Sequence, residues 1–209
     1  MMRTRVKICG LSRESDIQTA VKAGADAIGL VFYEPSPRNV SIAQAAKLVK
    51  QVPAFVTTVG LFVNAQKAEV EEVIQHTGID LLQFHGDESA GFCEQFDRPY
   101  IKALRVSDDT EITHFASLYS SATGLLLDTY QKGKPGGTGE TFNWDLIPEN
   151  LNLPVILAGG LKQDNVAQAI EKVRPYAVDV SGGVEMEKGI KDKDKIYAFM
   201  KEVQGVDRS

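Results

Sequence analysis

Short apolar runs and amphipathic stretches alternate along the whole chain. The apolar runs are continuous and do not alternate with polar residues, which is typical of strands in a parallel sheet buried on both faces. They predict eight strands, at Arg5–Cys9, Ala27–Phe32, Thr57–Val63, Asp80–His85, Tyr100–Val106, Gly124–Thr129, Pro154–Ala158 and Ala177–Ser181. Successive strands begin 20 to 30 residues apart, which is enough for a strand, a crossover helix and two loops.

The stretches between the strands carry helix start and stop signals. Ser12 is expected to cap a helix that ends at Gly24, and Asn64 to precede a helix over Ala65–Thr77 that stops at Gly78. The same signals predict five more helices, at Ser41–Val52, Glu88–Phe96, Asp109–Ser120, Gln163–Val173 and Lys191–Val203.

Eight strand–helix units in 209 residues predict one α/β domain over residues 1–209, a single (β/α)₈ TIM barrel. The alternative fold, a doubly wound sheet of five or six strands, would use only five or six of these units and leave two or three unused. The weakest crossover is Tyr130–Asn152, which begins glycine-rich and offers only a short helix near Trp144. Long loops of this kind are often functional.

Composition narrows the class of protein. Hydrophobic residues make up 43% of the chain and charged residues 24%, which is ordinary globular usage. The net charge of −5 argues against a partner that is a nucleic acid or an anionic membrane. The longest apolar run, near Pro154–Leu161, is too short to span a bilayer, and the amino terminus has no signal-peptide core. Two cysteines, Cys9 and Cys93, make no disulfide framework, which predicts a cytoplasmic location.

In barrels of this kind the active site lies on the loops that follow the strands. Two glycine-containing segments, Gly159-Gly160 and Ser181-Gly182-Gly183, follow the seventh and eighth strands. Glycine lets backbone N–H groups approach phosphate oxygens closely, and a short helix at this place adds positive potential. Either pair alone is explained as turn glycines, but two pairs at neighbouring strand ends favour a phosphate site.

Two residues at strand ends could form an acid–base pair. Asp128 follows three leucines in the sixth strand, and a carboxyl group there is either hydrogen-bonded as a loop cap or used as a general acid. Cys9 is either a small core residue or, just ahead of the helix that begins near Ser12, a thiolate whose pKa lies below the free value of about 8.5. No set of residues with metal-ligand spacing is present, so no metal is expected.

Three other polar residues at strand ends have two alternative roles each. Arg38 is either a surface arginine or a clamp for a carboxylate, and His85 either a structural histidine or a substrate contact. Asp179 either binds a sugar hydroxyl or braces its loop. Lys102 and Arg105 reach the interior or the mouth of the barrel without an assignable role.

The chain resembles phosphoribosylanthranilate isomerases of the tryptophan pathway over nearly its whole length. The resemblance rests on Val6-Lys7-Ile8-Cys9-Gly10-Leu11, Ser36-Pro37-Arg38, Leu82-Gln83-Phe84-His85-Gly86, Leu127-Asp128, Gly136-Gly137-Thr138-Gly139, Leu157-Ala158-Gly159-Gly160-Leu161 and Val178-Asp179-Val180-Ser181-Gly182-Gly183-Val184-Glu185. Two departures are visible: Ser181-Gly182 stands where the family often has two serines, and Phe142-Asn143-Trp144 where it usually has Phe-Asp-Trp.

The resemblance implies a cofactor-independent Amadori rearrangement of N-(5-phosphoribosyl)anthranilate to the 1-deoxyribulose 5-phosphate derivative. It makes Asp128 the general acid that opens the ribose ring and Cys9 the general base that removes the C2 proton. Arg38 would hold the anthranilate carboxylate, and the glycine loops after the last two strands the phosphate. The partner is then a small phosphosugar, with the chain acting as a monomer or a homodimer.

Three alternatives stay open at this stage. The histidine-pathway isomerase performs the same rearrangement, but its strand-1 base is an aspartate and its substrate carries a phosphate at each end. Indole-glycerol-phosphate synthase relies on lysines at strand ends that are missing here. A non-catalytic phosphosugar-binding barrel would keep the glycine loops but has no need of Cys9 opposite Asp128.

Overall fold

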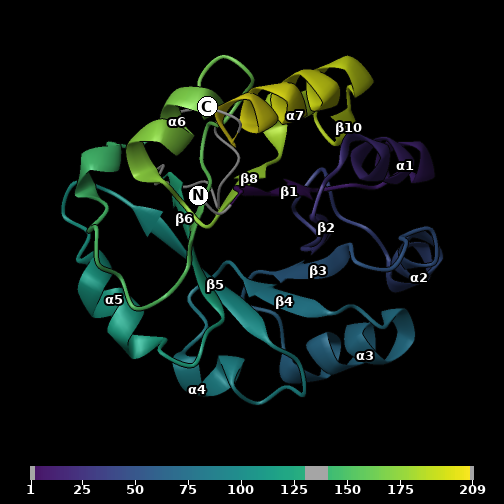
Figure 1. Cartoon of the computed structure of the whole chain (residues 1–209). Helices are drawn as coiled ribbons and strands as arrows, with labels where there is room; N and C mark the ends of the chain where they lie inside the picture. The colour runs from purple at the N-terminus through teal and green to yellow at the C-terminus, as the bar shows by residue number, and fades with distance from the viewer. Residues whose placement is uncertain (1–2, 130–140, 208–209) are drawn as a thin grey trace.

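The computed structural model describes residues 3–129 and 141–207, and within them eight parallel strands close into a barrel. Each strand pairs with its neighbours in chain order, and β8 pairs back onto β1 (Figure 1). The strands are β1 Arg5–Cys9, β2 Ala27–Phe32, β3 Thr57–Phe62, β4 Leu81–Phe84, β5 Tyr100–Val106, β6 Gly124–Thr129, β7 Val155–Leu157 and β8 Ala177–Val180. The predicted barrel is confirmed: four strands have the predicted bounds, and the ends of the other four differ from them by one residue.

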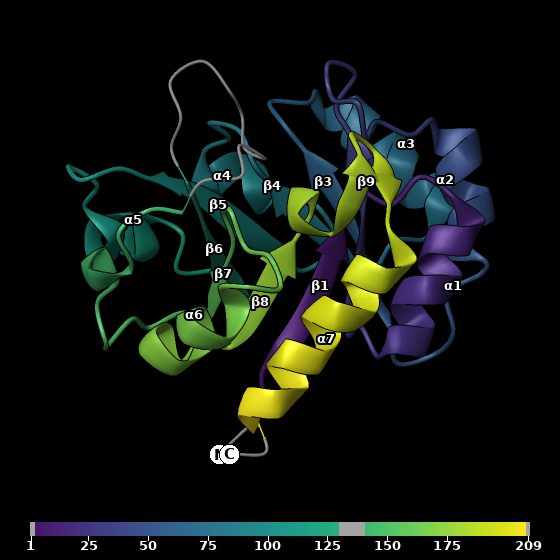
Figure 2. The same cartoon turned by 90° about the horizontal axis from the view of Figure 1, so that it is seen from above.

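Helices lie around the outside of the barrel (Figures 1 and 2). They are α1 Glu14–Ala23, α2 Ile42–Val49, α3 Lys67–Thr77, α4 Ala90–Cys93, α5 Ile112–Leu118, α6 Val166–Val173 and α7 Lys193–Asp207. Two 3₁₀ turns, η1 Trp144–Leu146 and η2 Gly182–Val184, follow β6 and β8. The short helix expected near Trp144 is η1, and Asn143 caps it by accepting the N–H of Asp145 at 3.1 Å. Of the predicted stretch Tyr130–Asn152, residues 130–140 lie outside the described residues.

The helices begin one to three residues later than the sequence-based ranges, and at two of them the residue expected at the start has another partner. Ser12 does not cap α1; its hydroxyl donates instead to the carbonyl of Gly189, 3.2 Å away, and the helix begins at Glu14. Asn64 does not cap α3, because it takes a left-handed conformation (φ 53°) and its side chain accepts the N–H of Asp87. In both cases a loop from another part of the chain binds the polar side chain more favourably than the nearby helix end does.

A small hairpin was not expected from the sequence. After η2 the chain forms β9 Glu185–Glu187 and β10 Ile190–Lys191, an antiparallel pair. Gly189 in its turn packs so closely on Pro37 that a Cβ there would lie 2.6 Å from the Pro37 carbonyl oxygen. The hairpin therefore joins the loop after β8 to the loop after β2.

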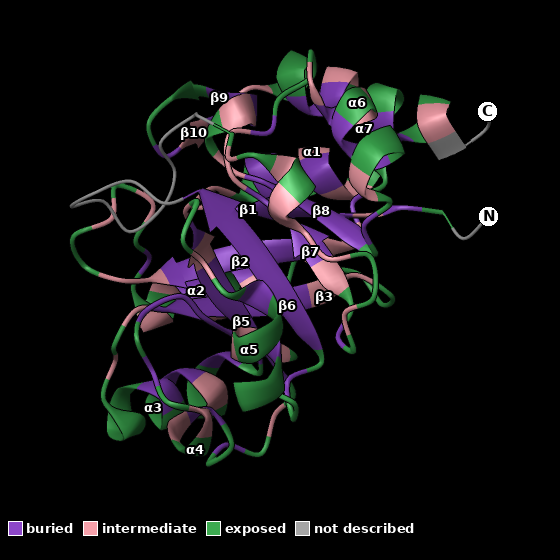
Figure 3. Cartoon of the chain, turned by 90° about the vertical axis from the view of Figure 1, so that its left-hand side faces the viewer, coloured by how far each residue is buried: buried purple, intermediate pink, exposed green. Residues whose placement is uncertain are grey.

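The core has two layers, which Figure 3 shows as the purple strands and the purple inner faces of the helices. The larger layer lies between the strands and the helices and includes Phe62, Phe84, Ile17 and Phe199. The smaller layer fills the barrel itself and includes Ala103, Leu126 and Ile156. Since side chains alternate along a strand, residues two positions from these also face the barrel interior. This alternation places the polar residues at the carboxyl ends of the strands in a common space.

Candidate active site

Cys9 is the last residue of β1 and lies on the interior side of the barrel. Its side chain packs with Val31 and Leu61, and only 4% of the residue is exposed. Burial favours the neutral thiol and raises the pKa of Cys9, although the nearby ammonium groups of Lys7 and Lys191 oppose this shift. The expectation that a helix start would depress this pKa is wrong, because α1 begins five residues further on and the site is buried.

Asp128 faces the interior from β6, two residues after the interior-facing Leu126. One carboxylate oxygen, Oδ1, accepts the backbone N–H of Thr129 at 2.8 Å, and Oδ2 lies 3.1 Å from His85 Nε2. The residue is 5% exposed, so these two hydrogen bonds fix the direction in which the carboxyl group points.

His85 follows β4 and connects Asp128 to Gln83. The Gln83 amide nitrogen lies 2.9 Å from His85 Nδ1, so its N–H donates to that nitrogen and leaves the imidazole proton on Nε2. The Nε2–H of His85 then donates to Asp128. His85 therefore has a structural partner, which is one of the two roles expected from the sequence. The other amide atom, Gln83 Oε1, is buried without a hydrogen-bond partner among the described residues.

Asp179 does not brace its loop; it pairs with Lys7 inside the barrel. The Lys7 amine donates to Asp179 Oδ1 at 2.9 Å, and the two residues are register partners on β1 and β8. Sequence reasoning gave Lys7 no role. The available signal was its position two residues before Cys9 on a buried strand, which puts both side chains on one face.

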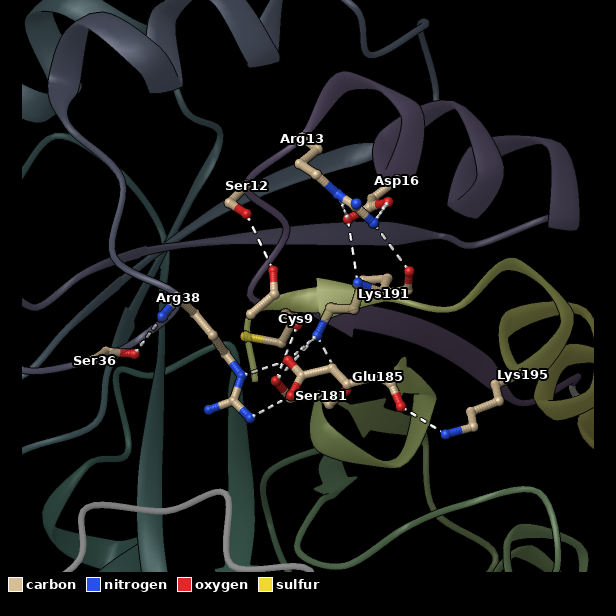
Figure 4. A network of polar contacts seen from close by, with 11 residues as sticks. Cys9, Ser12, Arg13, Asp16, Ser36, Arg38, Ser181, Glu185, Lys191 and Lys195 are labelled. Carbon is tan, nitrogen blue, oxygen red and sulfur yellow. Dashed lines mark hydrogen bonds and ion pairs between the residues drawn. The ribbon is translucent and has the colours of Figure 1, made fainter. Parts of the chain in front are cut away.

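Arg38 is held by a second buried network, which Figure 4 shows beside Cys9. Its Nε and one terminal nitrogen donate to the two carboxylate oxygens of Glu185 at 2.7 and 2.8 Å. The Lys191 amine donates to the same carboxylate at 2.9 Å and to the Ser181 carbonyl at 3.1 Å. Arg38 is therefore no free surface arginine, because Glu185 already takes one edge of its guanidinium group. Neither Glu185 nor Lys191 was singled out from the sequence.

Burial and charge act in opposite directions on this network. Burial alone favours the protonated acid, but the hydrogen bonds from Arg38 and Lys191 outweigh it and lower the pKa of Glu185. Burial also lowers the pKa of Lys191, against the attraction of Glu185. The carboxylate is thus charged at neutral pH and orients the two cations around it.

The glycine segments after β7 and β8 lie against each other. Gly159 and Gly160 have left-handed backbones (φ 77° and 63°), and a Cβ on Gly183 would lie 1.9 Å from the carbonyl oxygen of Leu161. Gly159 also adjoins the acid, since its Cβ would lie 3.0 Å from Asp128 Oδ1. Ser181, between β8 and η2, donates its hydroxyl to the Cys9 carbonyl at 3.1 Å. The predicted phosphate segments therefore border both Cys9 and Asp128.

Lys102 lies outside this space, on the helix side of β5. Its amine is buried against the Glu88 carboxylate at 3.1 Å and the Gly86 carbonyl at 2.6 Å. Arg105 contacts the exposed Asp87 at 3.3 Å. Cys93 is also buried in the helix layer, where burial raises its pKa to about 12 and leaves it a thiol.

Residues 3–129 and 141–207 contain no group of three His, Cys, Asp or Glu side chains suited to a metal ion. The same two segments contain no helix with the length and apolar character needed to cross a bilayer.

Comparison with known proteins decides among the phosphosugar barrels. The model of the N-(5'-phosphoribosyl)anthranilate (PRA) isomerase family matches residues 6–202. The chain belongs to this family. The N-(5'-phosphoribosyl)anthranilate isomerase of Pseudomonas savastanoi pv. phaseolicola is 58% identical over 98% of this chain and 100% of that protein. That of Pseudomonas fluorescens Pf-5 is 59% identical, covering 98% of this chain and 97% of that protein.

Solved structures of PRA isomerases have the same fold. The enzyme from Thermotoga maritima superposes with a TM-score of 0.90 at 37% identity, covering 97% of this chain and 99% of that one. A PRA isomerase in complex with reduced 1-(o-carboxyphenylamino)-1-deoxyribulose 5-phosphate gives 0.87 at 36% identity and the same coverage. The family and enzyme class predicted from the sequence are confirmed, and the histidine-pathway, indole-glycerol-phosphate and non-catalytic alternatives are set aside.

Proposed function

We propose that Asp128 and Cys9 are the general acid and general base of the PRA isomerase reaction in this chain. The reaction converts N-(5'-phosphoribosyl)anthranilate to 1-(2-carboxyphenylamino)-1-deoxyribulose 5-phosphate, a step of tryptophan biosynthesis. The observation that carries the assignment is that β1 and β6 bring both side chains to the carboxyl end of one barrel interior, where Thr129 and His85 orient the carboxyl group of Asp128.

The first step opens the ribose ring. Asp128 donates a proton to the ring oxygen while the bond from that oxygen to C1 breaks, and the anthranilate nitrogen supplies the electron pair that forms an iminium ion. The two hydrogen bonds from Thr129 and His85 stabilise the carboxylate that is left. Asp128 is thereby held in one orientation before and after the transfer.

The second step moves the double bond. The positive iminium nitrogen acidifies the C2 proton, which the Cys9 thiolate removes, and the C–H electron pair forms an enolamine as the iminium nitrogen becomes neutral. Proton return to C1, together with loss of the proton on the C2 hydroxyl, then gives the C2 ketone. The reaction redistributes electrons within one molecule, so it needs no external oxidant, and the expected absence of cofactor and metal stays a prediction.

The two ends of the substrate have separate binding groups in this proposal. Arg38 binds the anthranilate carboxylate with guanidinium nitrogen atoms that face away from Glu185. Backbone N–H groups of Gly159, Gly160, Gly182 and Gly183 bind the phosphate, and the hydroxyl of the neighbouring Ser181 anchors this loop to the Cys9 carbonyl. The ligand bound in the related crystal structure carries the same two groups, a carboxyphenylamino group and a 5-phosphate. Asp179 acts by holding the Lys7 amine, and His85 acts by orienting the carboxyl group of Asp128.

The roles of Asp128 and Cys9 are tested by Asp128→Asn and Cys9→Ala. Each variant should lower kcat by about 10²- to 10⁴-fold, because each removes one proton-transfer group, while product still binds. Turnover is followed by the loss of PRA fluorescence, and product affinity by titration calorimetry. A variant with a kcat close to that of the unmodified enzyme removes its residue from the scheme.

We also propose a cytoplasmic homodimer. A Thermotoga maritima PRA isomerase is dimeric, as the structure of its engineered monomers records. Two reduced, buried cysteines suit a reducing compartment.

A further inference from the structure

Lys7 and Asp179 form a buried ion pair in the barrel interior, next to Cys9. The Lys7 amine lies 2.9 Å from Asp179 Oδ1, and the two side chains are 6% and 8% exposed. A buried pair of this kind contributes little net stability, because the cost of removing both charges from water offsets their attraction. Its presence beside the proposed base therefore calls for a role other than stabilising the fold.

Lys7 and Cys9 lie over the same glycine. A Cβ built on Gly29 of β2 would lie 2.8 Å from Cys9 Sγ and 3.2 Å from Lys7 Cε. The missing side chain thus makes room for the sulfur and the lysine chain side by side. Because Lys7 and Cys9 are two residues apart on β1, their side chains also share one face of the strand, and the amine that pairs with Asp179 lies on the side of the sulfur.

The charged groups that face Cys9 come from four elements. Lys7 lies on β1, Asp179 on β8, Lys191 on β10, and Arg38 in the loop after β2. Glu185 on β9 holds the last two by its carboxylate. Lys7 is the cation with the largest effect on the Cys9 pKa, and Asp179 opposes it less strongly.

The helix start expected to stabilise a thiolate is too distant to do so. The field of a helix terminus falls off within its first turn, and α1 begins only at Glu14. A nearby cation is therefore needed for Cys9 to ionise in a buried site.

We infer that Lys7 is a positioning residue whose ammonium group holds the Cys9 sulfur over Gly29 and stabilises its thiolate, with Asp179 fixing the ammonium group. This inference rests on the proposed function, in which the Cys9 thiolate removes the C2 proton. It also gives Asp179 a role through Lys7 in place of a substrate contact.

A second buried lysine pair provides a matched control. Lys102 and Glu88 have side chains 1% and 2% exposed and lie 3.1 Å apart, but they are on the helix side of β5. Neither is among the main influences on the Cys9 pKa. Removing this pair should affect folding to a similar degree without changing the residues packed around Cys9.

The test measures the ultraviolet absorbance of the thiolate against pH in a Cys93→Ala background, so that only Cys9 contributes. The Lys7→Met/Asp179→Asn double variant removes both charges together and leaves no unpaired one. We expect it to raise the pKa of Cys9 by about 1–3 units. The acidic limb of the kcat/KM profile should move by the same amount. Lys7→Arg keeps the positive charge, so the Cys9 pKa in this variant should stay close to that of the parent.

Each of three outcomes overturns the inference. The double variant has the same Cys9 pKa as the parent, or the Lys102→Met/Glu88→Gln control shifts the Cys9 pKa by as much as the double variant does. In the third, Lys7→Arg shifts it by as much as the double variant does. The titration uses no substrate. An active Cys9→Ala variant therefore refutes the role of Cys9 as the base and leaves the titration result for Lys7 unchanged. An unshifted titration refutes the positioning role of Lys7 and leaves the role of Cys9 as the base unaffected.

Discussion

At the scale of single residues, Glu185 has the clearest consequence for stability. Its carboxylate accepts from Arg38 at 2.7 and 2.8 Å and from Lys191 at 2.9 Å, in a buried position at the mouth of the barrel. These two cations come from different loops, so one side chain joins the loop after β2 to the β9–β10 hairpin. Its loss leaves two cations close together without an anion.

Glu185→Gln should lower the free energy of unfolding by about 3 kcal/mol at pH 7, the usual cost of breaking a buried ion pair. The pKa of Glu185 is lowered in the folded state, so its stabilising effect is complete above the unfolded value of about 4.3. The effect disappears as pH falls through the lowered value. Urea unfolding of both proteins at several pH values should show their difference shrinking in acid.

The exposed Glu171 on α6 serves as the control for this experiment. Glu171→Gln should have nearly the parent's stability at every pH. A Glu185 effect that is as large in acid as at neutral pH would contradict the charge-based explanation.

At the scale of elements, the loops after β7 and β8 are packed together without room for side chains. Gly183 is the middle residue of η2, and a Cβ on it would point at the backbone of Leu161. The obstacle is a carbonyl oxygen, which cannot turn aside as a flexible side chain can. The two segments proposed to bind phosphate are thus held in a fixed relation by backbone contact.

Gly183→Ala should separate these loops, because the new Cβ would lie 1.9 Å from the Leu161 oxygen. We expect a loss of about 1–3 kcal/mol in stability, the range found for overpacking, and a higher KM for PRA with a smaller change in kcat. Thermal unfolding and steady-state kinetics measure the two effects.

Gly205→Ala is the matched substitution, because no heavy atom lies within 4 Å of a Cβ at that position in α7. It should leave KM unchanged and stabilise the helix by about 0.5–1 kcal/mol. Equal KM values for the two variants would show that loop contact at Gly183 does not shape the phosphate site.

At the scale of the whole molecule, the two ends of the barrel differ in character. The carboxyl end carries the buried polar networks, whereas the amino end has a hollow of about 430 Å³ that adjoins the start of β3 and includes Val52, Val56 and Gly78. Phe55 at this hollow is fully exposed and takes a left-handed backbone (φ 71°), which is unfavourable for a bulky residue. An exposed aromatic side chain beside a hollow on the same face is typical of a self-complementary contact between two copies.

Phe55→Asp should therefore convert a homodimer to a monomer, because it places a charge in the proposed contact. Sedimentation equilibrium should give half the parent's mass, and kcat should stay within about twofold because the site lies at the other end of the barrel. Leu118→Asp on α5, which is also exposed, should leave the mass unchanged. A parent protein that is itself monomeric rules out this interface.

The sequence by itself determined the barrel and the identity of the two proposed proton-transfer residues. Buried parallel strands need unbroken apolar runs, so the local sequence alone predicts where the strands lie. A carboxyl group or thiol that ends such a run is visible for the same reason. Helix starts were not fixed by the local sequence, since the side chains of Ser12 and Asn64 bind distant loops.

Only the tertiary structure decided the partners of those residues. Lys7 meets Asp179 across 172 positions of the chain, and Arg38 meets Glu185 across 147. Such pairs follow from the register of β1 with β8 and from the hairpin that brings Glu185 beside Arg38, neither of which has a local signal. The ionisation of Cys9 also depends on burial and on cations from other elements, so the sequence-based expectation for its pKa had the wrong sign. Chemical identity is a local property of the chain, whereas desolvation and charge pairing exist only after the strands have closed.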